Sequence, residues 1–264
     1  MINRTLTSLE RSWRVIATAF AFMCFGLGGL VLGICFFPAL NFFVRENDNR
    51  TRLARFAVHL NFKLFIHLMR QLGILRFEIE GVEKLSRPSL LILANHPTLI
   101  DVVHLVSLIP NADCVVKAGL ARNIFTRGPV RATNYICNDS GVGLIEDCIA
   151  SIKNGSSLVI FPEGTRTPVN GEMKLQRGAA NIAIRGQCNI TPISISCAPL
   201  SLTKGLAWWK VPPKPMKFII KVHNDIEISS FIEQASGESA LAARYLTDYL
   251  HLYFLEKRRT HAVT

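Results

Sequence analysis

A histidine and an aspartate stand five residues apart, directly after an apolar stretch of the chain. The stretch covers residues 90–94, and Asn95, His96 and, further on, Asp101 follow it. Histidine is the side chain whose unperturbed pKa lies near neutral pH, and an adjacent carboxylate can hold its ring in one orientation. Such a pair can take the proton from a hydroxyl group, so His96 and Asp101 are candidates for general-base catalysis.

These two side chains meet only if the chain changes its structure at His96. Residues five apart on one continuous helix point about 140° apart. Pro97 favours a helix that begins directly after His96, because proline is preferred at the first helical position. Helical side chains also lean toward the N-terminus, so we predict a helix over residues 98–109 with Asp101 directed at His96. The alternative is that His96 only caps this helix and that Asp101 is a solvated carboxylate in its first turn.

A second polar motif, Phe161-Pro-Glu-Gly-Thr-Arg166, follows another apolar stretch. The Arg166 guanidinium suits a phosphate or a carboxylate, and Gly164 lets the backbone approach a ligand closely. Glu163 would either orient Arg166 or bind a substrate hydroxyl. The alternative is a surface turn with a solvated Glu–Arg pair, which contributes little free energy.

Basic residues also stand where a helix of small residues is predicted to begin. Lys174 and Arg177 precede residues 179–185, and cations at a helix N-terminus oppose the helix dipole. A bound anion would remove this conflict, whereas a solvated basic turn is the simpler alternative.

Short apolar runs alternate with helical patterns after residue 75. We predict strands over residues 75–79, 90–94, 114–116, 158–161, 190–196 and 218–222, and helices over residues 98–109, 144–153, 179–185 and 240–256. This alternation predicts an α/β fold, with a mixed, largely parallel β-sheet flanked by helices. Ligands of such sheets bind at the carboxyl ends of strands, which is where His96 and Glu163 stand.

The N-terminal part has a different character. Residues 15–44 contain no charged side chain, and this run exceeds the roughly 20 residues that a helix needs to cross a membrane. Arginines flank the run on both sides and give no orientation, so a single tilted span and a re-entrant hairpin both remain open. Residues 52–75 form a basic amphipathic pattern that fits either a lipid surface or a helix docked on the core. We therefore divide the chain into membrane-associated helices over residues 1–75 and a catalytic domain over residues 76–264.

Charge and cysteine content limit the possible partners. The net charge of +11 favours an anionic partner, and the apolar N-terminus makes this partner a membrane in preference to a nucleic acid. The seven cysteines are scattered without a paired spacing, which predicts neither a zinc site nor a disulfide framework. We expect no metal, and a reducing compartment around the catalytic part.

In their order and spacing, these motifs resemble the sequence blocks of the glycerophospholipid acyltransferases. The agreeing segments are Asn95-His-Pro-Thr-Leu-Ile-Asp101, Phe161-Pro-Glu-Gly-Thr-Arg166, Thr191-Pro-Ile-Ser194, Val116-Lys117 and Arg177-Gly178. The resemblance implies acyl transfer from acyl-CoA or acyl-carrier protein as co-substrate, with no further cofactor and with lysophosphatidate as a common acceptor. It also implies an enzyme at the inner membrane whose catalytic domain faces the cytoplasm.

One departure from the family's pattern concerns the acceptor. Members that act on glycerol phosphates usually have an arginine after a hydrophobic strand between the first two blocks. The corresponding stretch here is Asn134-Tyr-Ile-Cys-Asn-Asp-Ser-Gly141, which has none. Arg131, Arg127 or Lys117 would have to replace it, or else the acceptor is another lipid hydroxyl, such as that of lyso-ornithine lipid.

The expected mechanism places His96 as the base and Asp101 as the residue that holds its ring. Backbone amides beside His96 or Gly164 would stabilise the oxyanion. The loop of Glu163, Gly164, Thr165 and Arg166 would bind the acceptor, and Lys117, Arg131 and Arg177 would help to hold its anionic head. Two other classes compete with this assignment: a thioesterase or lipid hydrolase in which the same pair activates water, and a non-catalytic lipid-binding protein.

Overall fold

A seven-stranded sheet forms the centre of the molecule in a computed structural model, which describes residues 2–123, 126–139, 143–169 and 172–262. The strand order is β1-β7-β6-β2-β5-β3-β4, and all neighbours are parallel except the antiparallel pair β6–β7. The strands are β1 (Leu75–Glu80), β2 (Leu91–Ala94), β3 (Ala112–Val116), β4 (Ile136–Cys137), β5 (Ser157–Ile160), β6 (Ile190–Ala198) and β7 (Met216–Val222). The predicted mixed, largely parallel α/β fold is therefore confirmed. The sequence prediction omitted β4, because two residues are too few to show a strand pattern.

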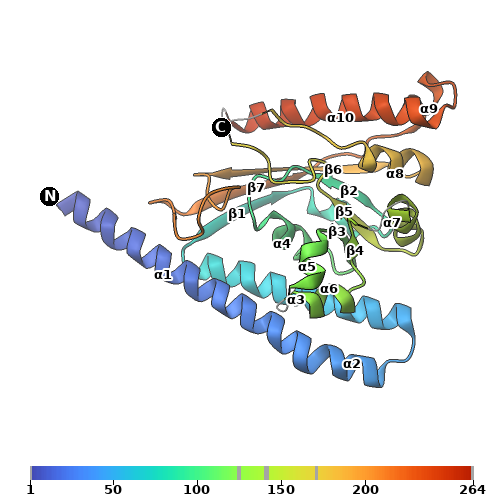
Figure 1. Ribbon diagram of the computed structural model, residues 1–264. Coiled ribbons are helices and arrows are strands. Elements are labelled where there is room, and N and C mark those ends of the chain that lie inside the picture. Colours follow the sequence, from blue (N-terminus) through green and yellow to red (C-terminus); the bar gives the residue numbers. More distant parts are fainter. Residues whose placement is uncertain (1, 124–125, 140–142, 170–171, 263–264) are drawn as a thin grey trace.

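Helices cover both faces of the sheet (Figure 1). One layer contains α7 (Leu144–Lys153), α8 (Gly178–Gly186) and α10 (Ser239–Ala262), and the other contains α3 (Asn47–Gln71) and α4 (Asp101–Val106). Strand β2 contributes to both cores, because Leu91 and Leu93 face the α8–α10 layer while Ile92 and Ala94 face the α3–α4 layer. Burial on both faces explains why this strand is apolar throughout. The shorter helices are η2 (Val82–Ser86), α5 (Ala118–Arg122), α6 (Arg127–Ala132) and α9 (Ser229–Gln234).

The N-terminal apolar run forms one continuous helical path. Helix α1 (Ile2–Val31) passes through a π-helical turn, η1 (Leu32–Phe36), into α2 (Phe37–Phe43). The chain reverses only after Phe43, and α3 then runs back beside α1 (Figure 1). A hairpin within residues 15–44 is thus not formed. The stretch Leu9–Phe43 is long and apolar enough to cross a membrane, with a mean hydropathy of 2.3, which favours membrane association.

Helix α3 has two apolar faces. One face joins the core through Val58, Phe65, Ile66 and Met69, where the Phe65 ring contacts Phe22 and Phe25 of α1. The other face leaves four large apolar side chains exposed: Leu53, Phe56, Leu60 and Leu64. Helix α3 therefore docks on the protein core, and its second apolar face remains exposed on the surface. The helix covers residues 47–71 and not the predicted 52–75.

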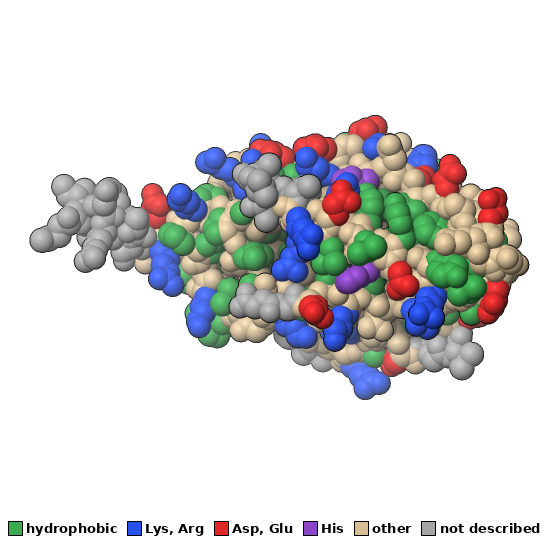
Figure 2. Space-filling model, turned by 90° about the horizontal axis from the view of Figure 1, so that it is seen from above, with side chains coloured by type: hydrophobic (Ala, Val, Ile, Leu, Met, Phe, Trp, Pro, Cys, Tyr) green, Lys and Arg blue, Asp and Glu red, His purple; other side chains and the backbone are tan. Residues whose placement is uncertain are grey.

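The surface over α10, on the side of the sheet opposite α3, carries both charged and hydrophobic side chains. Acidic and basic side chains surround the exposed hydrophobic ones on this face (Figure 2). Leu252 and Tyr249 of α10 are among the exposed side chains.

Candidate active site

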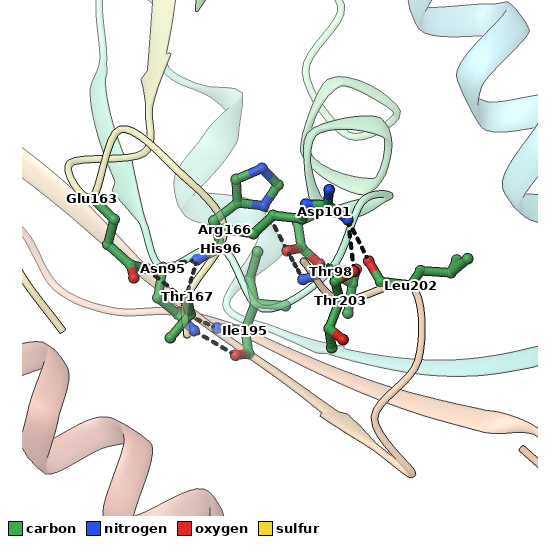
Figure 3. A network of polar contacts seen from close by, with 10 residues as sticks. All are labelled: Asn95, His96, Thr98, Asp101, Glu163, Arg166, Thr167, Ile195, Leu202 and Thr203. Atoms are coloured by element: carbon green, nitrogen blue, oxygen red, sulfur yellow. Dashed lines mark hydrogen bonds and ion pairs between the residues drawn. The ribbon is translucent and has the colours of Figure 1, made fainter. Parts of the chain in front are cut away.

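His96 and Asp101 form a hydrogen-bonded pair at the carboxyl end of β2 (Figure 3). The Nδ1 atom of His96 lies 2.8 Å from Oδ2 of Asp101, whose side chain is fully buried, whereas the side chain of His96 remains 18% exposed. No described residue forms a hydrogen bond with Nε2 of His96, so this atom is available to a substrate. The Phe161 ring stacks on the imidazole with a centroid distance of 4.2 Å.

The turn that brings them together differs from the predicted one. Helix α4 begins at Asp101 and not after His96, so the predicted start of this helix is wrong. Before α4, the Asp101 carboxylate accepts hydrogen bonds from the amide and the hydroxyl of Thr98, each at 2.6 Å. These bonds close a turn that ends the extended segment. Thr98 was missed by the sequence analysis, although a threonine three residues before an acid is the spacing of a capping box.

The surroundings of Asp101 determine both the orientation and the pKa of its carboxyl group. Burial raises the pKa of Asp101, and the hydrogen bonds from His96 and Thr98 oppose that rise. Both carboxylate oxygens are used, since Oδ1 bonds Thr98 and Oδ2 bonds His96 as well as Thr98. The carboxylate therefore cannot turn away from the ring, and the ring presents Nε2 outward.

Glu163 connects the second motif to the first. Its Oε1 atom accepts hydrogen bonds from the His96 amide at 3.1 Å and from the Thr167 hydroxyl at 2.6 Å. The Thr167 amide in turn donates to the His96 carbonyl at 2.7 Å. Burial raises the pKa of Glu163. Of the two alternatives for Glu163, a contact with Arg166 is not formed, because the adjacency of β2 and β5 brings Glu163 to the backbone of His96 instead. Binding of a substrate hydroxyl by Glu163 stays a prediction. Thr167 was missed because nothing in its local sequence marks it.

Arg166 lies on the other side of the same turn (Figure 3). One guanidinium nitrogen donates to the carbonyls of Leu202 and Thr203, at 2.9 Å and 3.0 Å. Thr165 before it is half-buried. Gly164 has a φ of 64°, in the left-handed region that favours glycine. The glycine therefore shapes the turn from which Arg166 extends.

The amides of His96 and Gly164 themselves already have acceptors. The His96 amide bonds Glu163, Pro97 has no N–H, and the Gly164 amide donates to the Phe161 carbonyl at 3.0 Å. These two amides are thus occupied by the turn itself, and an oxyanion contact from an amide beside them stays a prediction.

The remaining predicted cations form no hydrogen bond or ion pair with the described residues of this network. Lys117 follows β3, which neighbours β5, and is exposed at the same edge of the sheet as Glu163. Arg131 lies on α6 and Arg177 precedes α8, and both side chains are exposed. Neither bonds His96, Asp101 or Glu163 among the described residues. Of these three, the strand order therefore places Lys117 best for a shared substrate.

The stretch that lacks the family's arginine forms β4 and its flanks. Val116 pairs with Cys137, so β4 ends at the same edge of the sheet as β3. The side chain of Asn138 accepts the Ala118 amide at 3.2 Å. Ser140 and Gly141 of this stretch lie outside the described residues.

A groove of about 480 Å³ opens on the α10 side of the first motif. Asn95, Pro97 and Thr167 line it next to the first motif, and Leu200, Ile219 and Phe254 supply apolar lining. The Asn95 side chain also bridges to β6, since it bonds both the amide and the carbonyl of Ile195. The groove therefore adjoins the backbone around His96.

Comparisons with known proteins agree with this arrangement. Residues 76–196 match the sequence model of the Acyltransferase family. The chain is 28% identical over 172 residues to a 1-acyl-sn-glycerol-3-phosphate acyltransferase of Helicobacter pylori, covering 62% of this chain and 68% of that protein. It is 26% identical over 149 residues to the Pseudomonas aeruginosa protein of the same name, covering 53% and 57%.

A solved structure shares the fold. The crystal structure of the 1-acyl-sn-glycerophosphate (LPA) acyltransferase PlsC from Thermotoga maritima superposes with a TM-score of 0.61 at 20% identity, covering 88% of this chain and 97% of that chain. The matched family region includes both His96 and Arg166. By the match over residues 76–196 and by its relatives, the chain is an acyltransferase that is similar to the glycerophospholipid acyltransferases.

Proposed function

We propose that this enzyme transfers a fatty acyl chain from a thioester to the hydroxyl of a 1-acylglycerol-3-phosphate. The observation that carries the proposal is the His96–Asp101 pair, in which Asp101 holds Nδ1 at 2.8 Å and Nε2 faces outward. The names of the relatives from Helicobacter pylori and Pseudomonas aeruginosa support the same acceptor.

His96 acts as the base in this proposal. Its Nε2 takes the proton of the acceptor hydroxyl while the oxygen attacks the carbonyl carbon of the thioester. A C–O bond forms, and collapse of the tetrahedral intermediate breaks the C–S bond. The proton on Nε2 then passes to the departing thiolate, which leaves as the free thiol of CoA or acyl-carrier protein. Asp101 stabilises the imidazolium between these two transfers.

Arg166 and Lys117 hold the anionic head of the acceptor. One nitrogen of Arg166 is bound to two carbonyls, which aims the rest of the guanidinium, and a guanidinium can bind a phosphate through two parallel bonds. Lys117 adds a second cation from the same edge of the sheet. The missing arginine near β4 favours a second candidate acceptor, a lipid hydroxyl without a glycerol phosphate, such as that of lyso-ornithine lipid.

Membrane attachment through α1 and α2 would give the enzyme access to either candidate acceptor, because both are membrane lipids. The apolar stretch Leu9–Phe43 is only 11% buried in its most apolar window, which supports contact with a bilayer. Attachment at the inner membrane with the site on the cytoplasmic side would expose His96 to soluble acyl donors.

The direct test uses purified full-length protein with labelled acyl-CoA or acyl-carrier protein. Lysophosphatidate, lyso-ornithine lipid and buffer alone serve as the three acceptor conditions, and mass spectrometry identifies the product. We expect phosphatidate with the first acceptor. Product only with lyso-ornithine lipid would replace the acceptor, and free fatty acid without any acceptor would identify a hydrolase.

A further inference from the structure

The loop between β6 and β7, residues 199–215, exposes large apolar side chains next to cations. Leu200, Trp208 and Trp209 are 48%, 40% and 55% exposed. Lys204, Lys210 and Lys214 of the same loop are also exposed. Exposed indoles beside lysines are the side chains that proteins place at the level of lipid headgroups. We call residues 199–215 the tryptophan loop.

The tryptophan loop lies against α1 at the beginning of its apolar run. Trp208 contacts Phe22 edge-on, with ring centroids 6.3 Å apart, and the Arg14 guanidinium donates to the carbonyl of Pro213. Arg11 and Arg14 are the last charged residues before the uncharged stretch of α1. The loop therefore runs beside α1 from the last charged residue, Arg14, into the apolar stretch at Phe22, which is the part of α1 that would meet a membrane surface.

All three tryptophans of the chain lie on α1 or in the loop beside it. Trp13 is 54% exposed and donates its indole N–H to the Leu72 carbonyl at 3.1 Å. Trp208 contacts α1 nine residues further along, which corresponds to about 14 Å of helix. Tryptophans gathered beside one helix in this way resemble the aromatic belt of membrane proteins, where indole rings contact lipid headgroups.

The exposed apolar surface continues from this belt along the two long helices. On α1 the exposed side chains recur at helical spacing, at Ile16, Phe20, Met23 and Leu27, and on α3 they are Leu53, Phe56, Leu60 and Leu64. A surface of this extent is larger than the scattered apolar residues of a soluble protein. The tryptophan loop thus extends an apolar face and is not an isolated patch.

The base of the same loop holds Arg166. The carbonyls of Leu202 and Thr203 accept its guanidinium, and the Leu99 amide donates to Leu202 at 3.0 Å. Leu202 is only 2% exposed, whereas Lys204 and the residues toward Trp209 reach the surface. A contact made by the tip of the loop is therefore only a few residues from the group that fixes Arg166.

We propose that the tryptophan loop is a second membrane contact, which inserts Trp208 and Trp209 among the headgroups of an anionic bilayer beside α1. Lys204, Lys210 and Lys214 pair with the anionic headgroups. Docking of the tip orders its base and sets Arg166 at the lipid surface. Only this last step rests on the proposed role of Arg166; the membrane contact stands without it.

Fluorescence quenching tests the contact directly. The double variant Trp13→Phe, Trp208→Phe leaves Trp209 as the single tryptophan and keeps an aromatic ring against Phe22. The full-length variant is reconstituted with equal parts of phosphatidylcholine and phosphatidylglycerol, in which brominated chains replace a part of the lipid. Quenching of Trp209 emission by bromines near the headgroups is the expected result, and emission equal to that in unbrominated lipid would overturn the proposal.

A matched control places the only tryptophan on the far side of the molecule. It combines Trp13→Phe, Trp208→Phe and Trp209→Phe with Leu252→Trp on α10. Leu252 is 67% exposed, and α10 lies on the opposite side of the sheet from α1 and α3 (Figure 1). We expect no quenching there; equal quenching at both positions would show that the bilayer does not select the tryptophan loop, which would also overturn the proposal.

A kinetic comparison tests the effect on the site. Trp209→Ser should raise the apparent KM for a lysolipid embedded in vesicles and leave the rate with a dispersed short-chain lysolipid unchanged.

Charge variants test the contact with anionic headgroups. Lys204→Glu together with Lys210→Glu should lower the affinity of the enzyme for anionic vesicles by roughly fivefold for each positive charge removed. Lys153→Glu on α7 should leave this affinity unchanged. Equal losses with dispersed and embedded acceptors would contradict the coupling. Failure of the wild type on both acceptors would instead reject the proposed function and leave the quenching result valid.

Discussion

The amide nitrogen of His96 lies 3.1 Å from Oε1 of Glu163, although 67 residues separate them in the chain. The carboxylate of the second motif therefore supports the backbone of the first. Through this bond and the Thr167 hydroxyl, the turn after β5 fixes the position from which the His96 ring extends. We infer from these contacts that Glu163 is a positioning residue.

Replacing Glu163 tests this role. Glu163→Ala removes the acceptor of the Thr167 hydroxyl and one of the two acceptors of the His96 amide, which also donates to Oγ1 of Thr167 at 3.2 Å. This loss should lower the free energy of unfolding by about 1–3 kcal/mol. We expect kcat to fall while KM for the acceptor stays unchanged, since the bonded oxygen faces the protein. Glu163→Gln keeps an Oε1 acceptor and should restore most of kcat. A raised acceptor KM in the Gln variant would show instead that Glu163 binds the acceptor.

Replacing His96 and Asp101 one at a time should distinguish the general base from the residue that orients its ring. His96→Ala removes the base and should abolish acyl transfer. Asp101→Asn preserves the shape of a fully buried side chain but cannot stabilise the imidazolium, so we expect kcat to fall by about 10²- to 10⁴-fold. Rates are measured with labelled donor, and thermal unfolding verifies that each variant folds. Near-normal transfer by folded His96→Ala would reject the mechanism.

Replacing Arg166 should discriminate between acceptors. A hydrogen bond to a charged group contributes about 1.5–3 kcal/mol, so Arg166→Ala should lower kcat/KM for lysophosphatidate by roughly 10- to 150-fold. The loss with monoacylglycerol, which has no phosphate, should be much smaller. Arg166→Lys keeps the charge without the guanidinium fork and should recover only part of the activity. Equal losses on both acceptors would mean that Arg166 acts through the loop alone.

A buried histidine outside the site predicts how stability depends on pH. His104 is 1% exposed between the rings of Phe77 and Phe218, and burial lowers the pKa of its imidazole from 6.5 to about 3. Between these values the unfolded chain binds one proton more than the folded chain, so stability is lost as the pH falls below about 6.5. At about pH 5 this loss amounts to about 2 kcal/mol.

His104→Leu removes the titrating group and should remove this part of the loss. Chemical denaturation in detergent at about pH 7.5 and about pH 5 measures the difference. The wild type should lose about 2 kcal/mol more than the variant on acidification. The same loss in both proteins would assign the acid sensitivity to other groups.

The sequence by itself determined the fold class and the edge of the sheet at which chemistry is possible. Apolar runs of strand length are local features, and a residue that directly follows such a run stands at the carboxyl end of a strand. For this reason His96 and Glu163 were placed correctly. The apolar stretch of α1 and α2 was also evident, because it depends on composition alone.

Only the tertiary structure decided what these residues touch. The contact of Glu163 with His96 requires β2 and β5 to be neighbours, and the fixation of Arg166 requires the carbonyls of Leu202 and Thr203. The reversal of the chain after Phe43 likewise depends on α3 packing against the sheet. Each of these contacts joins segments far apart in the chain, and a local pattern carries no information about which distant backbone group will be adjacent.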